Sequence, residues 1–195
     1  MTAGLGHNQG PSLEAGQAWR THCWRKARAD LLPNLPIEIL RRRVARAKEL
    51  GLDYKSYASV RASTGRDVIG FLFSSNALRV FSHATSLPKD RGDKLDALKD
   101  CSRIALVSQP LNPDHLATAI AKGQLDHAAV APNFTTSWPG CRSAVQEAIA
   151  GRKLPADGVL LIGDTSLERE WSEAGKLAGY LPADRYFVGT QGVTL

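Results

Sequence analysis

Polar side chains follow each of four apolar runs in the second half of the sequence. Because the carboxyl ends of parallel strands meet at one edge of a sheet, we expect these side chains to line a ligand crevice there. The helix opened by Thr165 offers free N–H groups to an anion, although Asp164 beside it repels one. The alternative interpretation is that such residues only cap helices and build turns. The predicted crevice residues are Ser108, Asn133, Thr136, Asp164, Thr165 and Thr190.

A second candidate surface is basic and lies in the first half of the chain. Residues 1–83 hold 13 Lys and Arg against 6 Asp and Glu, whereas residues 84–195 hold 12 against 13. An arginine-rich helix face predicts contact with the phosphates of DNA or RNA, with little reading of bases. The same face suits an adaptor that docks on an acidic protein surface. The predicted nucleic-acid-binding residues are Arg25, Arg28, Arg41, Arg42, Arg43, Arg46 and Lys48.

One short motif has a counterpart in a known enzyme family. Gly163-Asp164-Thr165, after an apolar run, resembles the late acidic motif of haloacid dehalogenase-type phosphatases. The nucleophile motif of that family, DxDx[TV], is absent from the chain, so the nucleophile that covalent catalysis needs is missing. We therefore reject the assignment. The patterns GxxxxGK[ST], GxSxG and HExxH are absent as well. We therefore leave catalytic residues unassigned, do not decide whether the protein is an enzyme, and predict no cofactor and no metal site.

The crevice requires strands to position it, and the second half supplies their pattern. We expect strands at 103–107, 125–131, 158–162 and 185–188, separated by helices near 88–100, 112–122, 141–150 and 165–178. Short apolar runs alternating with helices are typical of β-α-β units. The sequence therefore predicts an α/β protein: a basic helical first half, packed on or linked to a small, mostly parallel, three-layer sheet of about four strands.

The first half predicts helices at 12–32 and 36–50, with Gly51 ending the second in a left-handed conformation. A short helix, Gly65 and a further helix at 66–81 have the outline of a helix-turn-helix. Residues 68–73 are too apolar to present donors and acceptors to base edges, so we do not favour that motif. A β-hairpin turning at 74–76 stays open for the same stretch.

The predicted organisation is a flexible tail at 1–12, an Arg-rich helical region at 13–83 and a Rossmann-like α/β region at 84–195. The apolar stretch at 68–81 favours packing of the two regions into one unit, but separate domains stay open. Three widely spaced cysteines, no apolar leader and no stretch of about 18 apolar residues predict a cytoplasmic protein without a transmembrane segment.

Overall fold

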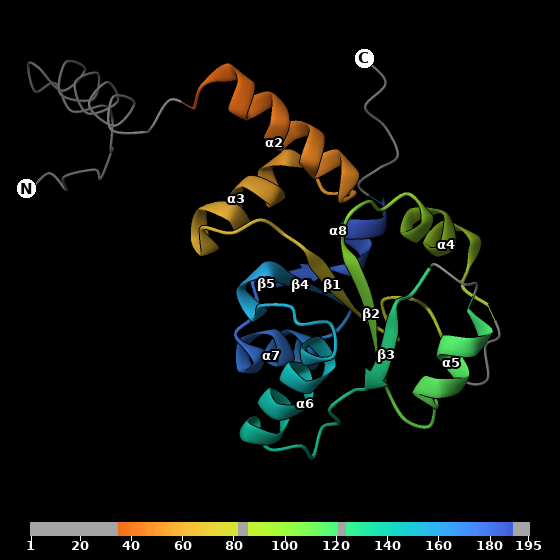
Figure 1. Ribbon diagram of the computed structural model, residues 1–195. Coiled ribbons are helices and arrows are strands. Elements are labelled where there is room, and N and C mark those ends of the chain that lie inside the picture. The colour runs from red at the N-terminus through yellow and green to blue at the C-terminus, as the bar shows by residue number, and fades with distance from the viewer. Residues whose placement is uncertain (1–34, 82–85, 121–123, 189–195) are drawn as a thin grey trace, which may run out of the picture. The chain divides into compact units, whose positions relative to one another are not determined.

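The structure is a computed structural model that describes residues 35–81, 86–120 and 124–188 (Figure 1). By its contacts the chain divides into residues 1–40 and residues 41–195, so the boundary falls within one helix, α2 (Ile37–Glu49). The helix predicted at 12–32, the predicted tail, and the site residues Arg25, Arg28 and Thr190 lie outside the described residues.

Five parallel strands form one sheet in the order β3-β2-β1-β4-β5 (Figure 1). The strands are β1 (Gly70–Ser74), β2 (Ser102–Val107), β3 (His127–Val130), β4 (Val159–Gly163) and β5 (Gly179–Pro182). Every residue of β1 and β4 is buried, because helices cover both faces of the sheet. The predicted α/β class with a parallel sheet is confirmed, with one strand more than expected.

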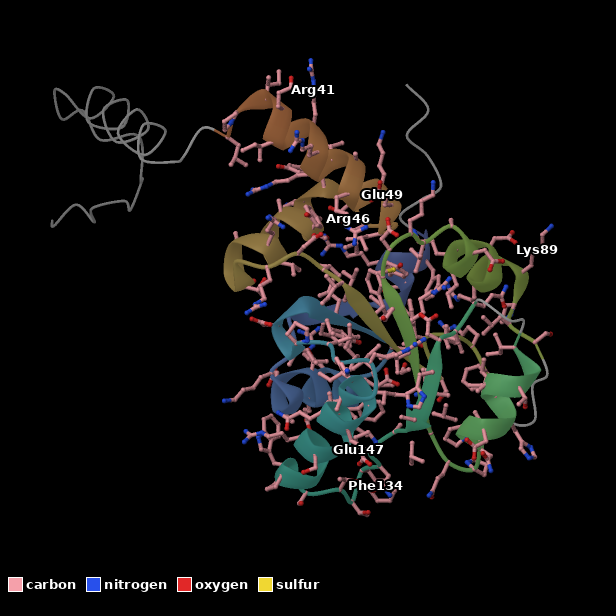
Figure 2. The ribbon with its side chains drawn as sticks, viewed as in Figure 1. Arg41, Arg46, Glu49, Lys89, Phe134 and Glu147 are labelled. Carbon is pink, nitrogen blue, oxygen red and sulfur yellow. The ribbon has the colours of Figure 1, made fainter. Side chains whose placement is uncertain are left out.

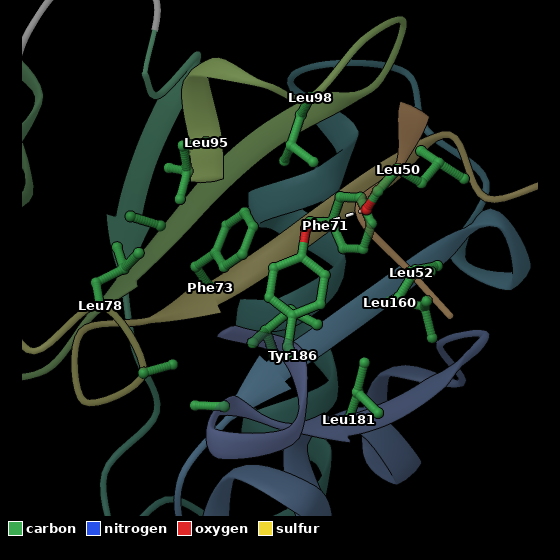
Figure 3. Packing of buried hydrophobic residues seen from close by; sticks show 14 of the residues in the cluster. Leu50, Leu52, Phe71, Phe73, Leu78, Leu95, Leu98, Leu160, Leu181 and Tyr186 are labelled. Atoms are coloured by element: carbon green, nitrogen blue, oxygen red, sulfur yellow. Dashed lines mark hydrogen bonds between the residues drawn. The ribbon is translucent and has the colours of Figure 1, made fainter. Parts of the chain in front are cut away.

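Two apolar clusters on opposite faces of the sheet form the core. Alternate residues of β1 point to opposite faces, so Phe71 and Phe73 join one cluster and Leu72 joins the other. Tyr186 packs on both phenylalanine rings, with centroids 5.5 and 5.9 Å away (Figure 3). The first face is covered by residues from the end of α2, from α3 (Tyr54–Thr64), α4 (Lys89–Asp96), α5 (Pro113–Ala119) and α8 (Ala183–Val188). The second face is covered by α6 (Trp138–Ala150) and α7 (Ser166–Gly175).

The stretch at 68–81 forms neither of the two structures expected from its sequence. Residues 70–74 are the central strand β1, paired in parallel with both β2 and β4, and a turn follows at 75–79. The helix at 66–81 and the hairpin are therefore wrong. A strand buried on both faces is apolar at successive positions, so it lacks the alternation that identifies a half-buried strand. As a result, residues 41–81, 86–120 and 124–188 contribute to one sheet and its core.

The last predicted strand, at 185–188, is also wrong, because these residues belong to the helix α8. Ala183 and Tyr186 are three positions apart, and both are buried in the first cluster. This packing outweighs the strand preference of the aromatic residues. The final strand is β5, directly before α8.

The turn after α2 follows the sequence expectation. Gly51 has φ 60°, and Gly65 after α3 has φ 72°. Both values lie in the left-handed region that glycine adopts most readily. None of the described helices is long and apolar enough to cross a membrane.

Candidate functional site

A pocket of about 310 Å³ lies at the carboxyl ends of four strands, and we call it the crevice. The chain runs from β1 to β2 and β3 on one side and places β4 on the other side of β1, so the strand order reverses here. This is where open α/β sheets bind ligands. The crevice is lined by Asn76 after β1, Ser108 and Gln109 after β2, Ala131–Phe134 after β3, and Thr165, Leu167, Glu168 and Trp171 after β4.

The structure brings together three of the six predicted crevice residues, namely Ser108, Asn133 and Thr165. Thr136 lies next to them, and its hydroxyl donates to Asn133 Oδ1 at 2.9 Å. Asp164 does not line the crevice, and its carboxylate pairs with Arg79 Nη1 at 2.9 Å. The sixth predicted residue, Thr190, lies outside the described residues.

The Asn133 side chain has an occupied acceptor, its Oδ1, and a donor group, its NH₂, that can face a ligand. Its Oδ1 accepts from Thr135 N–H at 3.0 Å, from Thr135 Oγ1 at 2.7 Å and from Thr136 Oγ1. These bonds build the loop between β3 and α6 and hold the side chain in one orientation. The Asn133 amide NH₂ donates to no side chain or carbonyl within the described part of the chain.

Glu168 is a site residue that the sequence reasoning missed. It is 1% exposed, and its Oε2 accepts from the backbone N–H groups of Asp164 and Thr165. Its Oε1 accepts from Asn76 Nδ2 at 2.8 Å. Thr165 and Glu168 form a capping box, whose spacing of three residues is the signal that reasoning from the sequence could have used.

The position of Glu168 places a negative charge beside the anion site expected at the start of α7. Its carboxylate accepts from the N–H groups of Asp164 and Thr165, directly before the helix, so its negative charge disfavours a phosphate at that position. Gly163 allows this close approach, because a Cβ at Gly163 would lie 2.8 Å from Glu168 Oε2 and 2.7 Å from Tyr180 Cε2. The N-terminus of α7 therefore carries a carboxylate supplied by the chain itself.

The turn after β1 holds Asn76 in place through bonds to the neighbouring strand. Ser75 N–H donates to Leu106 O at 2.9 Å, and Ser108 N–H donates to Ser75 Oγ at 3.2 Å. Both bonds tie the end of β1 to the end of β2. The crevice wall is therefore positioned by buried backbone, which limits its movement.

Trp171 supplies a donor that has no acceptor within the described residues. It is 2% exposed and lines the crevice, and its indole Nε1–H is buried without a hydrogen bond there. Buried donors are almost always paired with protein or water, so such a group needs an explanation. The nitrogen itself is shielded from solvent, so it meets a ligand acceptor only when the side chain shifts toward the crevice.

Aromatic groups lie at the margins of the crevice. Phe134, labelled in Figure 2, is 85% exposed although it is a large apolar side chain. Tyr180 donates through its hydroxyl to Thr165 O at 3.3 Å. Burial, and next the Glu168 carboxylate, raise the pKa of Tyr180, so its hydroxyl keeps the proton that it donates.

The predicted nucleic-acid-binding residues of α2 have different surroundings. Arg41, Arg42 and Lys48 are exposed, and Arg43 is half-buried. Arg46 instead turns inward and donates to Asp67 Oδ2 at 3.0 Å and to Asp100 O at 2.9 Å (Figure 2). Burial alone lowers the pKa of Arg46, but the adjoining carboxylates of Glu49 and Asp67 raise it overall. Arg46 therefore stabilises the fold rather than facing a phosphate.

The strand order and the crevice are those of a Rossmann-like α/β protein. Comparisons with models of protein families, with curated proteins and with solved structures gave no match for this chain. Within the described ranges, no group of three or more His, Cys, Asp or Glu side chains is placed to hold a metal ion. Indications of function therefore come from the residues of the chain itself.

Proposed function

We propose that this protein binds a small, uncharged, polar molecule in the crevice, as a sensor or as an enzyme. The observation that carries the proposal is Trp171, a buried indole donor without a described acceptor in the wall of a pocket at the switch point of the sheet. A volume of about 310 Å³ suits a small metabolite, because ligand pockets start near this size.

The chemistry of the lining supports a neutral ligand. The Glu168 carboxylate binds the N–H groups of Asp164 and Thr165 just before α7, so its charge disfavours an anionic ligand there, and Asp164 is paired with Arg79. Asn133, Ser108 and the Trp171 indole offer donors to oxygen atoms of a ligand, and the exposed Phe134 ring offers a flat apolar contact. A monosaccharide or a nucleoside has this combination of hydrogen-bonding groups and a flat face.

Thermal denaturation with added ligands tests this proposal. A ligand at 100 times its Kd stabilises the folded state by about 2.7 kcal/mol. For a chain of this length such a gain raises Tm by about 5–10 °C. We expect a rise with neutral sugars or nucleosides that is larger than with their phosphate esters and persists at high salt.

Two matched variants make the test specific to the crevice. Trp171→Phe removes the indole donor and should abolish the ligand-induced rise in Tm, whatever its effect on the Tm of the free protein. Trp138→Phe, at an exposed tryptophan outside the crevice lining, should keep the rise in full. Equal ligand-induced rises in the two variants would refute the proposal.

A second candidate function is binding of a nucleic-acid backbone, which the exposed residues Arg41, Arg42 and Lys48 on α2 favour. Replacing these three by Ala should lower affinity for short DNA or RNA and flatten its salt dependence. The same face equally suits an acidic protein partner, and co-purification of such a partner without nucleic-acid affinity distinguishes that alternative. A cytoplasmic location belongs to these proposals, supported by the free thiols of Cys101 and Cys141.

A further inference from the structure

A larger groove, of about 700 Å³, lies along the outer edge of β3, and we call it the β3 groove. Residues 127–131 form its floor, and β3 is one of the two edge strands of the described sheet. One wall is the start of α5 at residues 112–114, and the other is the α6 face with Ala144, Glu147 and Ala148. The groove thus follows an open strand edge between two helices.

Backbone groups of β3 point into this groove. Ala131 N–H donates inward to Val107 O at 2.9 Å, and β3 pairs with β2 in regular parallel register. Because backbone groups alternate in direction along a strand, the N–H and C=O groups of Ala128 and Val130 face the open edge. The strand carries no proline and no Lys, Arg, Asp or Glu, which are the usual protections of an edge against pairing.

The lining leaves room for another backbone. Ala128, Ala129, Ala144 and Ala148 have short side chains, so the floor and one wall stay clear. Val130 is 54% exposed, although it is an apolar strand residue. Main-chain bonds and an apolar side chain are together what an added strand uses for binding.

The charge of the lining favours a basic occupant. Asp114 on one wall and Glu147 on the other are exposed carboxylates, and Figure 2 labels Glu147 on α6. The groove lining contains no Lys or Arg. The alternative occupant is a second copy whose β3 pairs antiparallel with this one, about a two-fold axis perpendicular to the sheet. In that arrangement α6 lies on the same face of the sheet in both copies. The two Glu147 carboxylates then lie on neighbouring helices and repel, so charge favours a separate basic segment.

We propose that the β3 groove binds an extended, basic peptide segment of a partner protein, which adds to the sheet as a sixth parallel or antiparallel strand. The segment pairs with the open backbone groups of Ala128 and Val130, and its Lys or Arg side chains approach Asp114 and Glu147. The groove adjoins the crevice and shares four lining residues with it, but the proposed peptide contacts, at Ala128, Val130, Asp114 and Glu147, lie outside the crevice lining.

The test uses fluorescence anisotropy with the intact protein and a labelled seven-residue valine peptide with two adjacent lysines at its centre, because neighbouring side chains of a strand point to opposite faces, one toward Asp114 and one toward Glu147. We expect saturable binding that is about tenfold tighter than that of the matched valine–glutamate peptide, because two attractive contacts become repulsive. Peptides carrying N-methyl groups on alternate amides, made in both registers, test strand pairing without changing the protein. Binding should be lost in one register, since one set of amides faces β3.

Variants identify the place of binding. Asp114→Asn with Glu147→Gln should weaken the lysine peptide about twofold to fivefold for each charge removed. The matched pair Asp93→Asn with Glu173→Gln removes two exposed carboxylates outside the groove lining and should leave peptide affinity unchanged.

Val130→Pro removes an outward N–H, which an edge strand tolerates, and should weaken binding about fivefold. Trp171→Phe should leave peptide affinity unchanged while it abolishes the ligand response of the crevice, so the two proposals fail separately.

Several results would overturn the inference. Equal affinity for the two peptides, full binding of both methylated registers, or no binding at low salt would each do so. Sedimentation of the protein as a dimer that Val130→Pro dissociates would show that a second copy occupies the edge.

Discussion

Replacing Arg46 by Met should destabilise the fold although the residue belongs to the basic helix α2. The Arg46 side chain is 17% exposed and donates to the backbone carbonyls of Val68, Lys99 and Asp100. It also pairs with Asp67 at 3.0 Å. These contacts link α2 to the residues directly before β1 and to the loop before β2. Arg46→Met leaves three carbonyls and two carboxylates, those of Asp67 and Glu49, without this donor.

The magnitude follows from the burial of these partners. Losing a partner of a fully buried charged group costs about 3–5 kcal/mol, and water can reach part of this cluster, so we expect a loss of about 2–3 kcal/mol. For a chain of this length the loss lowers Tm by about 5–10 °C. Differential scanning calorimetry measures it.

Arg42→Met is the matched control, because Arg42 lies on the same helix and is exposed. Exposed substitutions of this kind change stability by less than about 0.5 kcal/mol. If Arg46→Met melts at the Tm of the unchanged protein, or if Arg42→Met melts equally early, the assignment of Arg46 to the fold is wrong. Arg46→Met should also leave any nucleic-acid affinity unchanged at temperatures where it stays folded.

Three further predictions concern other parts of the fold. Burial lowers the pKa of Lys94 to about 8 from an ordinary 10.5, so the unfolded chain binds more protons between these values. Stability should therefore rise as pH increases from 8 to 10.5, and the urea midpoint of Lys94→Met should lack this rise. Gly163→Ala forces a Cβ into the carboxylate beneath it and should cost about 1–3 kcal/mol in urea unfolding, whereas Gly151→Ala, with no atom within 4 Å of the added Cβ, should cost little. A double-mutant cycle on Arg79 and Asp164, a half-exposed pair, should give a coupling of about 0.2–1 kcal/mol that falls at high salt, and a larger coupling that persists in salt would contradict it.

The sequence predicts most of the sheet because short apolar runs between helices are distinctive. It predicts the strands β2, β3 and β4 and the capped helices α5 and α7. It misses β1, because a strand buried on both faces has neither the helical nor the alternating period. It misassigns α8, where Tyr186 forms a helix by packing on Phe71 and Phe73.

Part of the crevice is predictable from the order of elements. Ser108, Asn133 and Thr165 follow recognised strands, and strand ends meet at one edge. Asn76 is not predicted because β1, the strand that it follows, is not predicted. Glu168 and Trp171 lie inside the helix α7. Their place in the crevice depends on which face of this helix packs on the sheet, and the residues that follow the strands do not show that face.

Nuclear magnetic resonance with ¹⁵N-labelled protein tests the crevice most directly. Small neutral fragments, including sugars and nucleosides, are added while the backbone amides and the four tryptophan indole signals are followed. We predict that fragments shift the amides of Asn76, Ser108 and Thr165 and the indole signal of Trp171, and leave that of Trp138 unchanged. Shifts confined to other regions, or no shift at Trp171 with any neutral fragment at millimolar concentration, would contradict the crevice as the ligand site.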